Sequence, residues 1–298
     1  FPSLLFEYLK SDLLGVPLSS IAFVLNALIY NTEESYQALI QLDYLSYLIE
    51  ASKPPFEISK AVWVLGSIET IISSPFFDRF DCFHDIVEMS LVYFDLADKN
   101  QTHYPMTLVY LLFSRLLASY EQLTEEDFVS ITTDLIIERA FEILQQNAIP
   151  NISSVFFYIN NYIYSHNENS HKIITMGFLE LSFNIFKVCE LEHQILILSI
   201  LDNLAKDSVE NAVAVLKSPL VVEYLPLILI NGNLVLKKKS VFLILTLIKR
   251  FRIEGTESES SNLIYQLIIK VFHSIIDMLE SEDIEMINYT LQVIHYLT

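Results

Sequence analysis

The side chains of this chain that could do chemistry are spaced too irregularly to form a catalytic or metal centre. His166 and His171 lie five residues apart in a polar segment, a spacing that does not bring two imidazoles onto one helix face. Cys82 and Cys189 are distant in sequence and lie in apolar segments, as is typical of free thiols in a reducing compartment. No zinc-protease, phosphate-loop, hydrolase or paired-cysteine motif occurs. We therefore predict that the protein is not an enzyme and uses no metal or cofactor.

The charge of the chain points to recognition rather than to catalysis. Lys and Arg number 18, Asp and Glu number 37, and the formal net charge is −19. This balance argues against nucleic-acid binding, which needs clustered cations to replace phosphate counterions, and it favours basic partners. The same charge would also keep a very apolar protein in solution. Lys237–Lys239 form the only basic triplet, which suits a salt-bridge network or an acidic partner.

Seven apolar segments with helical periodicity recur along the chain at intervals of roughly 45 residues, each after a short polar break. They are SSIAFVLNALI (19–29), ISKAVWVLGSI (58–68), MTLVYLLFSRLLA (106–118), SSVFFYINNYI (153–163), EHQILILSILDNLA (192–205), KKSVFLILTLI (238–248) and INYTLQVIHYL (287–297). A repeat of this period cannot bury its apolar face alone and must stack on its neighbours. The pattern predicts an all-α solenoid of about seven repeats.

The predicted solenoid occupies residues 1–298 as a single domain, and we expect it to be a fragment of a longer chain. The breaks combine Pro, Gly, Asn, Ser and Asp, which cap helices and form turns, and the stretch RIEGTESESSN at 252–262 suits a solvated acidic loop. No apolar run reaches the ~18–20 residues that a membrane span needs, so no membrane contact is expected. Helices packed between neighbours account for the high apolar content.

Residues 166–205, HNENSHKIITMGFLELSFNIFKVCELEHQILILSILDNLA, resemble an armadillo repeat, with its short first helix and two longer ones. Gly177 stands where that family has a turn glycine between the first and second helices, a position that often needs positive φ. The resemblance extends over most of the chain. It implies a right-handed solenoid of armadillo (ARM/HEAT-like) repeats.

The first seventy residues are most similar to importin alpha (karyopherin alpha), the family of adaptors that recognise nuclear localisation signals. ISKAVWVLGSIE at 58–69 resembles that family's Q-A-V-W-A-L-G-N-I segment, and FPSLLFEYLKSD at 1–12 and the segment at 21–55 follow its first repeat in order and spacing. In that family the third helices carry a ladder of Trp and Asn four residues apart. Indole rings stack on peptide lysines, and asparagine amides hold the peptide backbone.

The resemblance places this ladder on two sets of positions. The aromatic positions fall at Phe23, Trp63, Tyr110, Phe157, Ser199, Phe242 and Leu291. The amide positions fall at Ala27, Ser67, Ser114, Asn161, Asn203, Thr246 and His295. Five of the first set are aromatic but two of the second set are Asn, so this ladder departs from the family's pattern. Aromatic residues at helical spacing would equally suit a core.

Two functions follow from these patterns. The first is an importin-alpha-type adaptor for nuclear import, which binds basic peptides along an acidic concave groove, works with an importin-beta-like karyopherin and moves between cytoplasm and nucleus. The second is a non-catalytic armadillo-repeat scaffold in a cytoskeletal or chaperone assembly, which needs no backbone-gripping ladder. A lipid-tethering surface is disfavoured because the net charge of −19 repels anionic membranes.

Overall fold

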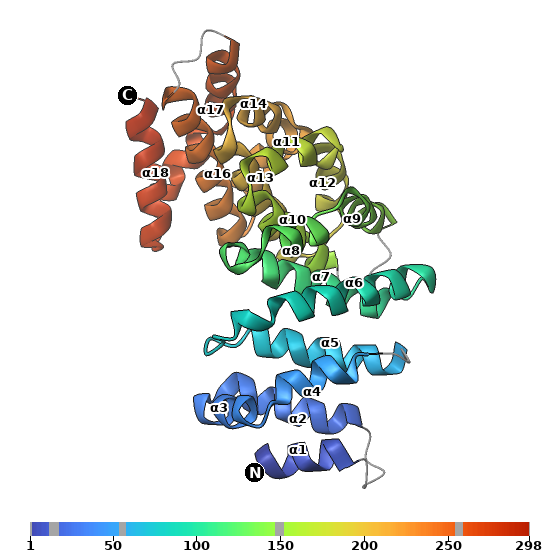
Figure 1. Ribbon diagram of the computed structural model, residues 1–298. Helices are drawn as coiled ribbons and strands as arrows, with labels where there is room; N and C mark the ends of the chain where they lie inside the picture. The colour runs from blue at the N-terminus through green and yellow to red at the C-terminus, as the bar shows by residue number, and fades with distance from the viewer. Residues whose placement is uncertain (1, 12–17, 54–57, 147–151, 254–258, 298) are drawn as a thin grey trace. The chain divides into compact units, whose positions relative to one another are not determined.

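The computed structural model describes residues 2–11, 18–53, 58–146, 152–253 and 259–297, and within these ranges the chain is helical without a β-strand. Figure 1 shows the helices following one another from end to end, joined by short turns. The prediction of an all-α solenoid is confirmed. Residues 254–258 of the predicted acidic loop lie outside the described residues.

Each of the seven recurring apolar segments forms a helix, which we call a third helix. The third helices are α2 (Leu18–Asn31), α5 (Ile58–Ile72), α7 (His103–Ala118), α10 (Ile152–Ser165), α13 (Leu191–Asp207), α16 (Leu234–Ile253) and α18 (Ile284–Leu297). They form here because their apolar residues recur at helical spacing on more than one face, so that each helix packs against several others.

The remaining helices stand before or between the third helices. They are α1 (Pro2–Ser11), α3 (Glu33–Gln41), α4 (Tyr44–Ala51), η1 (Phe80–Cys82), α6 (Phe83–Lys99), η2 (Tyr120–Gln122), α8 (Glu125–Ile131), α9 (Asp134–Gln146), α11 (Asn167–Thr175), α12 (Phe178–Phe186), α14 (Val209–Lys217), η3 (Leu220–Tyr224), α15 (Leu225–Asn231), α17 (Glu259–Asp277) and η4 (Met278–Glu280). A short first helix, a second helix and a long third helix recur in α3–α4–α5, α8–α9–α10 and α11–α12–α13. Before α6 the first helix is reduced to the single 3-10 turn η1.

Gly177 makes the turn between α11 and α12, as the resemblance implied. Its φ is 89°, in the left-handed region, and its N–H donates to the carbonyl of Ile174 at 2.9 Å. A side chain at this φ clashes with the backbone, whereas glycine adopts it freely. The turn reverses the chain within one residue and fixes the angle between the two helices.

Polar residues in the predicted breaks cap the helices that follow them. The hydroxyl groups of Thr32, Thr124 and Ser208 accept hydrogen bonds from backbone N–H groups three residues later, at 3.3, 3.1 and 3.1 Å. Each bond satisfies an N–H that has no partner within its own helix. The beginnings of α3, α8 and α14 are therefore determined by local sequence.

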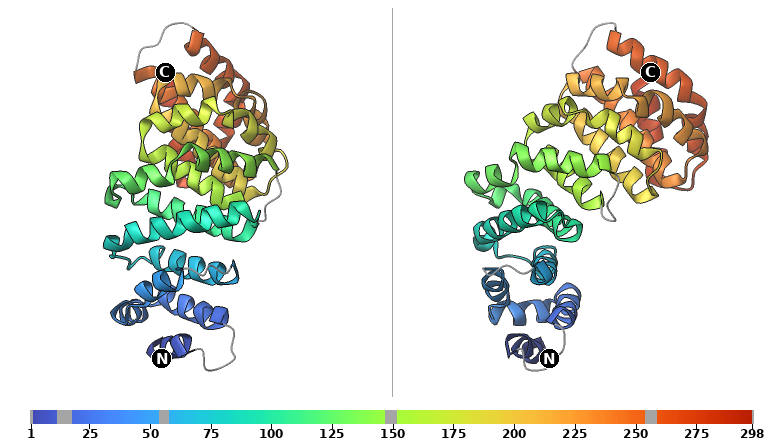
Figure 2. Two further views of the ribbon diagram at one scale, coloured as in Figure 1. Left: turned by 45° about the vertical axis from the view of Figure 1, so that its right-hand side comes forward. Right: turned by 90° about the vertical axis from the view of Figure 1, so that its right-hand side faces the viewer.

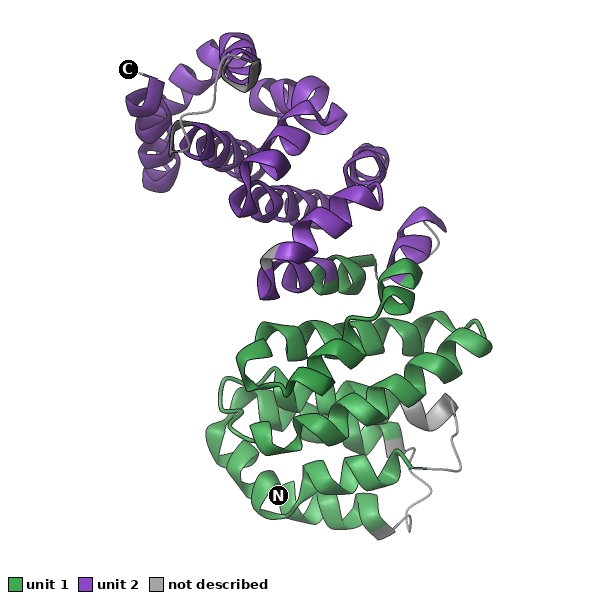
Figure 3. Cartoon of the chain, turned by 45° about the horizontal axis from the view of Figure 1, so that its top comes forward, with its two compact units in different colours: residues 1–139, 149–158 green, residues 140–148, 159–298 purple. Residues whose placement is uncertain are grey.

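The chain divides into two compact units, each a stack of helices (Figure 3). Unit 1 comprises residues 1–139 and 149–158, and unit 2 comprises residues 140–148 and 159–298. Within each unit, Figure 2 shows successive helices layered one on the next in chain order. The prediction of one uninterrupted domain over 1–298 stays a prediction.

The two units have cores of different composition. Unit 1 is centred on aromatic rings: Tyr110 packs against Phe94, Phe113 and Tyr158, with its ring centroid 5.2 Å from that of Tyr158. The centre of unit 2 is aliphatic, with Leu201 and Leu243 fully buried. Apolar burial on this scale is the main stabilising contribution to each stack.

One helix is long and apolar enough, by length and composition, to cross a membrane. It spans Asn262–Glu280, 19 residues with a mean hydropathy of 1.3, and 28% of it is buried. The sequence-based expectation passed over it because Lys270 and Asp277 interrupt the apolar run. Its buried side packs Leu267 and Val271 inside unit 2, where α17 contacts α14, α15 and α16. The bent pair Val209–Lys217 and Leu220–Asn231 passes the same test when taken as one span.

Candidate peptide-binding groove

Side chains on successive third helices are joined by hydrogen bonds between positions about one repeat apart. Such bonds require equivalent positions to stand side by side, so the third helices of each unit form one continuous face. In unit 1 the pair is Arg115 Nε to Glu69 Oε1 (3.2 Å), and in unit 2 the pairs are Asn203 Nδ2 to Asn160 Oδ1 (2.9 Å), Thr246 Oγ1 to Asp202 Oδ1 (2.6 Å) and Lys249 Nζ to Gln292 Oε1 (3.0 Å). The partners are 43 to 46 residues apart.

Three adjoining depressions run along the third-helix face of unit 2, and together we call them the unit 2 groove. The first has a volume of about 220 Å³, the second about 250 Å³ and the third about 440 Å³. Lys206 lines both the first and the second, and Phe242 lines both the second and the third. The depressions therefore form one path across α13, α16 and α18.

The side chains that line the second depression are mainly cationic and apolar. Lys206, Lys249 and Arg250 line it together with Phe242, Leu245 and Thr246, and no carboxylate is among its described lining residues. Asp207 lines the first depression, and Asp283 and Glu285 line the third, so acidic and basic side chains both occur along the unit 2 groove. The acidic groove expected from sequence stays a prediction. The net charge of −19 is a sum over the whole chain and does not determine the charge of a single depression.

Carboxylates near the groove are engaged by the protein itself. Asp202 is 6% exposed and accepts hydrogen bonds from Thr246 Oγ1 at 2.6 Å and from Lys206 Nζ. Burial raises the pKa of Asp207, although a hydrogen bond from Asn211 and the charge of Arg250 oppose the shift. These carboxylates lie under or beside the cations and lower their effective charge without removing it.

The basic triplet at the start of α16 has two roles. Lys238 pairs with Asp283 at 3.1 Å and with Glu285, which confirms the salt-bridge network expected from sequence. The hydrogen bond to Glu285, followed by that to Asp283, raises the pKa of Lys238 above its ordinary value. Lys239 lines the third depression beside Leu234 and Val235. One lysine therefore holds α16 to the start of α18, while its neighbour faces the groove.

Phe242 is the predicted aromatic position that lies in the groove. Its ring centroid is 5.0 Å from that of Tyr289, and Lys206 Nζ lies 5.1 Å from the Phe242 centroid. A lysine at this distance from a ring face makes a cation–π contact. The arrangement predicted for a peptide lysine is thus occupied here by a lysine of the same chain.

The other predicted aromatic positions separate into surface and core. Phe23 is 74% exposed, Phe157 37% and Leu291 53%, whereas Ser199 is half-buried and bonds the Ile195 carbonyl of its own helix. Trp63 is 8% exposed and Tyr110 is fully buried. The hydroxyl of Tyr110 donates to the Ile136 carbonyl at 2.7 Å, so Tyr110 is a core residue of unit 1.

Most of the predicted amide positions do not present a free amide to solvent. Ser67, Ser114 and Thr246 are buried, Ala27 and His295 are exposed, and Asn161 and Asn203 are half-buried. Asn203 gives one of its N–H groups to Asn160. The predicted ladder therefore does not form an unbroken row of amides available to a ligand.

A one-residue error in register explains the buried positions in α5 and α7. In α5 the half-buried face carries Val62 and Gly66, one residue before Trp63 and Ser67. In α7 it carries Leu111 and the exposed Arg115, one residue after Tyr110 and Ser114. One residue corresponds to about 100° of rotation around a helix, which is enough to move a side chain from the groove into the core.

Sequence reasoning missed Lys206, Lys249 and Tyr289 as groove residues. A signal for two of them was present, because Lys206 and Lys249 each lie three residues after a predicted amide position and therefore on the same helix face. No comparable signal marked Tyr289, which faces Phe242 of the preceding third helix only after the repeats are stacked.

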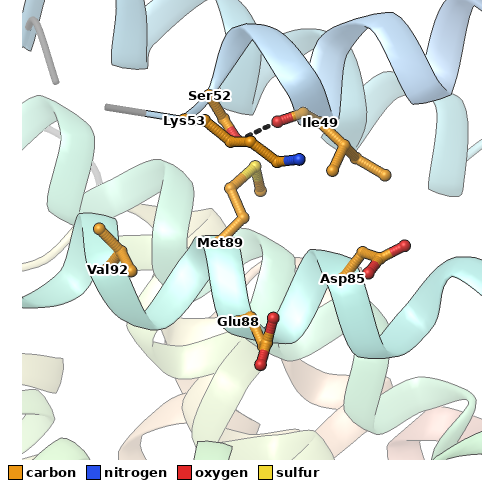
Figure 4. A pocket seen from close by; sticks show the side chains of 7 residues that line it. All are labelled: Ile49, Ser52, Lys53, Asp85, Glu88, Met89 and Val92. Atoms are coloured by element: carbon orange, nitrogen blue, oxygen red, sulfur yellow. Dashed lines mark hydrogen bonds between the residues drawn. The ribbon is translucent and has the colours of Figure 1, made fainter. Parts of the chain in front are cut away.

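A smaller depression of about 180 Å³ lies in unit 1 between the end of α4 and α6 (Figure 4). Met89 points from α6 toward Ser52 and Lys53, while Glu88 points away from them. Lys53 pairs with Glu50 at 2.6 Å, and Ser52 Oγ donates to the Ile49 carbonyl at 2.6 Å. These groups hold one another in place and form no nucleophile–base pair. No group of metal-ligating side chains occurs in the described part of the chain.

No protein-family model matches the chain, and no curated protein matches it significantly. Among solved structures, an engineered protein from the Northeast Structural Genomics Consortium aligns over 99% of this chain and 68% of its own, with a TM-score of 0.72 and 14% identity. A second engineered protein from that consortium aligns over 93% and 98%, with a TM-score of 0.56 and 11% identity. A designed armadillo repeat protein aligns over 100% and 99%, with a TM-score of 0.46 and 14% identity.

At 14% and 11% identity, the two engineered proteins show a common fold and nothing more. None of these comparisons shows a similarity to importin alpha. What the chain shares with these structures is the helical-repeat fold.

Proposed function

We propose that this chain is a non-catalytic protein-binding scaffold, and that the third-helix face of its repeats holds a segment of a partner protein. The observation that carries the proposal is the unit 2 groove, in which side chains from α13, α16 and α18 line three adjoining depressions. An extended groove that crosses several repeats suits a polypeptide better than a small molecule, which binds in a single enclosed pocket.

The chemistry of the groove supports binding without reaction. Its lining combines aromatic rings, lysines and aliphatic residues, which recognise side chains by contact and charge. The hydroxyl of Thr246 donates to the carboxylate of Asp202, but both side chains are buried and present no nucleophile to a ligand in the groove. A catalytic centre would need a nucleophile or a general acid within reach of a bound substrate.

Site-specific photo-crosslinking tests the scaffold proposal. A photoreactive amino acid replaces Phe242 in the groove, and in a matched variant it replaces Val188, which is 70% exposed and lines none of the three depressions. In lysate of the source cells, we expect the Phe242 variant to give discrete cross-linked bands that the Val188 variant lacks. Identical patterns from both positions, or no cross-link at Phe242, would count against a partner in the groove.

The importin-alpha-type adaptor is the second candidate, and the exposed aromatic residues of the ladder favour it. Phe23 is 74% exposed and Phe157 is 37% exposed, so both rings are available to stack on a peptide lysine. Glu69 on α5 is already paired with Arg115 and adds little attraction. Under this candidate the protein would bind basic localisation peptides, work with an importin-beta-like karyopherin and be found in both cytoplasm and nucleus. The buried Ser67 and Ser114 weaken it, because they leave the backbone of such a peptide with fewer donors.

Titration with a labelled lysine-rich localisation peptide tests the second candidate. We expect salt-sensitive binding that Phe23→Ala weakens, whereas Val188→Ala leaves it unchanged. Absence of binding at both low and physiological salt excludes this candidate and does not bear on the scaffold proposal.

A further inference from the structure

We infer that the unit 2 groove binds an acidic segment of its partner protein in extended form, with carboxylates on the lysines and an apolar side chain near Phe242. This inference rests on the proposed scaffold function and specifies the partner that the groove accepts. It is opposite in sign to the basic peptides expected from the net charge of the chain.

The cations of the second depression carry the inference. Lys206, Lys249 and Arg250 converge there from two third helices, and no carboxylate is among the described lining residues of this depression. Lys249 donates to the amide oxygen of Gln292 at 3.0 Å, and Arg250 donates to the backbone carbonyl of Asp207 at 2.8 Å. The Gln292 amide is neutral, so this bond leaves the positive charge of Lys249 in the groove, whereas Arg250 also acts on the nearby carboxylate of Asp207. Charge-assisted hydrogen bonds to a carboxylate are stronger than those to neutral acceptors.

The described carboxylates that line the groove are Asp207 in the first depression and Asp283 and Glu285 in the third, whereas none lines the second depression with Lys249. Asp202 is 6% exposed and is fixed between Thr246 and Lys206 below the groove surface. Asp283 and Glu285 in the third depression are held by Lys238. Lys239 lines the same depression and adds a further cation to the path. An acidic segment would therefore meet Lys239, Lys249 and Arg250 in succession.

The third depression offers an apolar surface to the bound segment, in addition to the lysines that would hold the acidic residues of that segment. Leu234 is 50% exposed and Val235 is 49% exposed, and both line it with Phe242 and Tyr289. Burying this surface under an aliphatic or aromatic side chain is favourable, whereas a purely acidic peptide would leave it in water. We therefore expect acidic residues interspersed with at least one large apolar residue.

The length of the segment follows from the spacing of the helices. Packed helices lie about 8–10 Å apart, so the path from α13 through α16 to α18 is roughly 20 Å long. An extended chain covers about 3.3 Å per residue, which gives a segment of roughly six residues.

A single-stranded nucleic acid would also present anions and apolar rings to this groove. It is less favoured because its charges continue beyond the groove and would meet a protein whose net charge is −19, whereas an acidic segment of six residues confines its charge to the lysines. A matched oligonucleotide therefore serves as a competitor in the test.

The test uses a fluorescein-labelled peptide of about ten residues, in which Asp and Glu alternate with Leu and Phe, followed by anisotropy on the whole chain. We expect binding that weakens from low to physiological salt, and about tenfold weaker binding in Lys249→Glu. Lys239→Glu provides a second variant on another turn of α16. Lys270→Glu makes the same change of net charge on exposed α17 outside the groove and should leave affinity within about twofold. Circular dichroism checks that each variant is folded.

Three results would overturn the inference. The first is equal binding of a peptide with Asn and Gln in place of the acids. The second is equal loss of affinity in Lys270→Glu and Lys249→Glu, and the third is tighter binding of the oligonucleotide than of the peptide. If the acidic peptide does not bind while the photoreactive residue at position 242 still captures a partner, the acidic-segment inference fails and the scaffold proposal stands. If the acidic peptide does not bind and no partner is captured at position 242, both the acidic-segment inference and the scaffold proposal fail.

Discussion

Asn203 on α13 donates a hydrogen bond from Nδ2 to Oδ1 of Asn160 on α10, at 2.9 Å and 43 residues away in sequence. The amide that was expected to hold a peptide backbone therefore holds the amide of the preceding repeat. Both side chains are half-buried, so the bond is partly protected from water. It fixes the two third helices relative to each other within unit 2.

The first prediction concerns the energy of this amide pair. Asn160→Ala and Asn203→Ala should each lower the free energy of unfolding by about 1 kcal/mol. The double variant should lose less than the sum, because either substitution alone already breaks the bond. Urea denaturation of the four proteins gives the coupling energy, and strictly additive losses would mean that the bond does not contribute to stability.

The second prediction concerns Asp202, which is buried and bonded to both Thr246 and Lys206. Asp202→Asn should lower the free energy of unfolding by about 1–3 kcal/mol. The substitution removes the buried negative charge, so the hydrogen bond from Lys206 to residue 202 is no longer an ion pair. The same variant should bind an acidic peptide more tightly, since Lys206 then keeps its charge for the ligand. Glu210→Gln, an exposed change of equal charge, controls for net charge. Unchanged stability and affinity in Asp202→Asn would contradict the assigned contacts.

The third prediction compares two glycines that have free space around them. Gly177 has φ of 89°, and an added Cβ at Gly177 or Gly66 would meet no atom within 4 Å. Gly177→Ala should therefore lose about 1 kcal/mol through backbone strain alone. Gly66→Ala lies inside α5 and should gain roughly 0.5–1 kcal/mol through helix propensity. Thermal or urea unfolding measures both, and effects of the same sign would contradict this reasoning.

The fourth prediction concerns pH and a histidine–carboxylate pair in unit 1. His84 Nδ1 lies 2.8 Å from Oδ1 of Asp127, whose side chain is 3% exposed, and His84 Nε2 lies 3.6 Å from Oε1 of Glu88. The hydrogen bond to Asp127 is the main reason that the pKa of His84 is raised above 6.5. Burial acts to raise the pKa of Asp127, but hydrogen bonds from Thr124 and His84 outweigh it and lower that pKa below 3.8.

A raised histidine pKa contributes stability that is complete below the unfolded-state value and is lost as the pH rises through the native value. The urea midpoint of the wild-type protein should therefore fall as the pH increases from below 6.5 to above the native pKa of His84. His84→Gln should reduce this fall, whereas His103→Gln, at an exposed histidine outside the pair, should retain it. An unchanged pH dependence in His84→Gln would show that the pair does not contribute. The lowered pKa of Asp127 acts at acidic pH, where the contribution of this carboxylate to stability is lost as the pH falls from 3.8 through the native pKa.

The helices of this fold were predictable because their determinants are local. Thr124 and Ser208 begin helices with their own hydroxyl groups, and Gly177 supplies a turn with positive φ. Each of these signals is carried by a few adjacent residues. Sequence periodicity alone was therefore sufficient to place every third helix.

The groove was less predictable because it depends on rotation and on stacking. Periodicity left the register of α5 and α7 uncertain by one residue, and that residue decided whether Tyr110 or Leu111 faced outward. The positive charge of the second depression was missed for a different reason. Lys206, Lys249 and Lys239 are far apart in a chain of acidic composition and come together only when α13 and α16 are packed.

Hydrogen bonds that span 43 to 46 residues join α5 to α7 in unit 1 and successive third helices from α10 to α18 in unit 2. A structure held in this way behaves as a row of coupled links, and its cooperativity is the sum of nearest-neighbour interactions. When such a stack is pulled from its two ends, the weakest interface between neighbouring repeats should open first. The molecule should then lengthen in steps, while the other interfaces stay intact. A partner segment bound across α13, α16 and α18 would contact several neighbouring repeats at once. Such a partner would also raise the resistance of these repeats to unfolding under force.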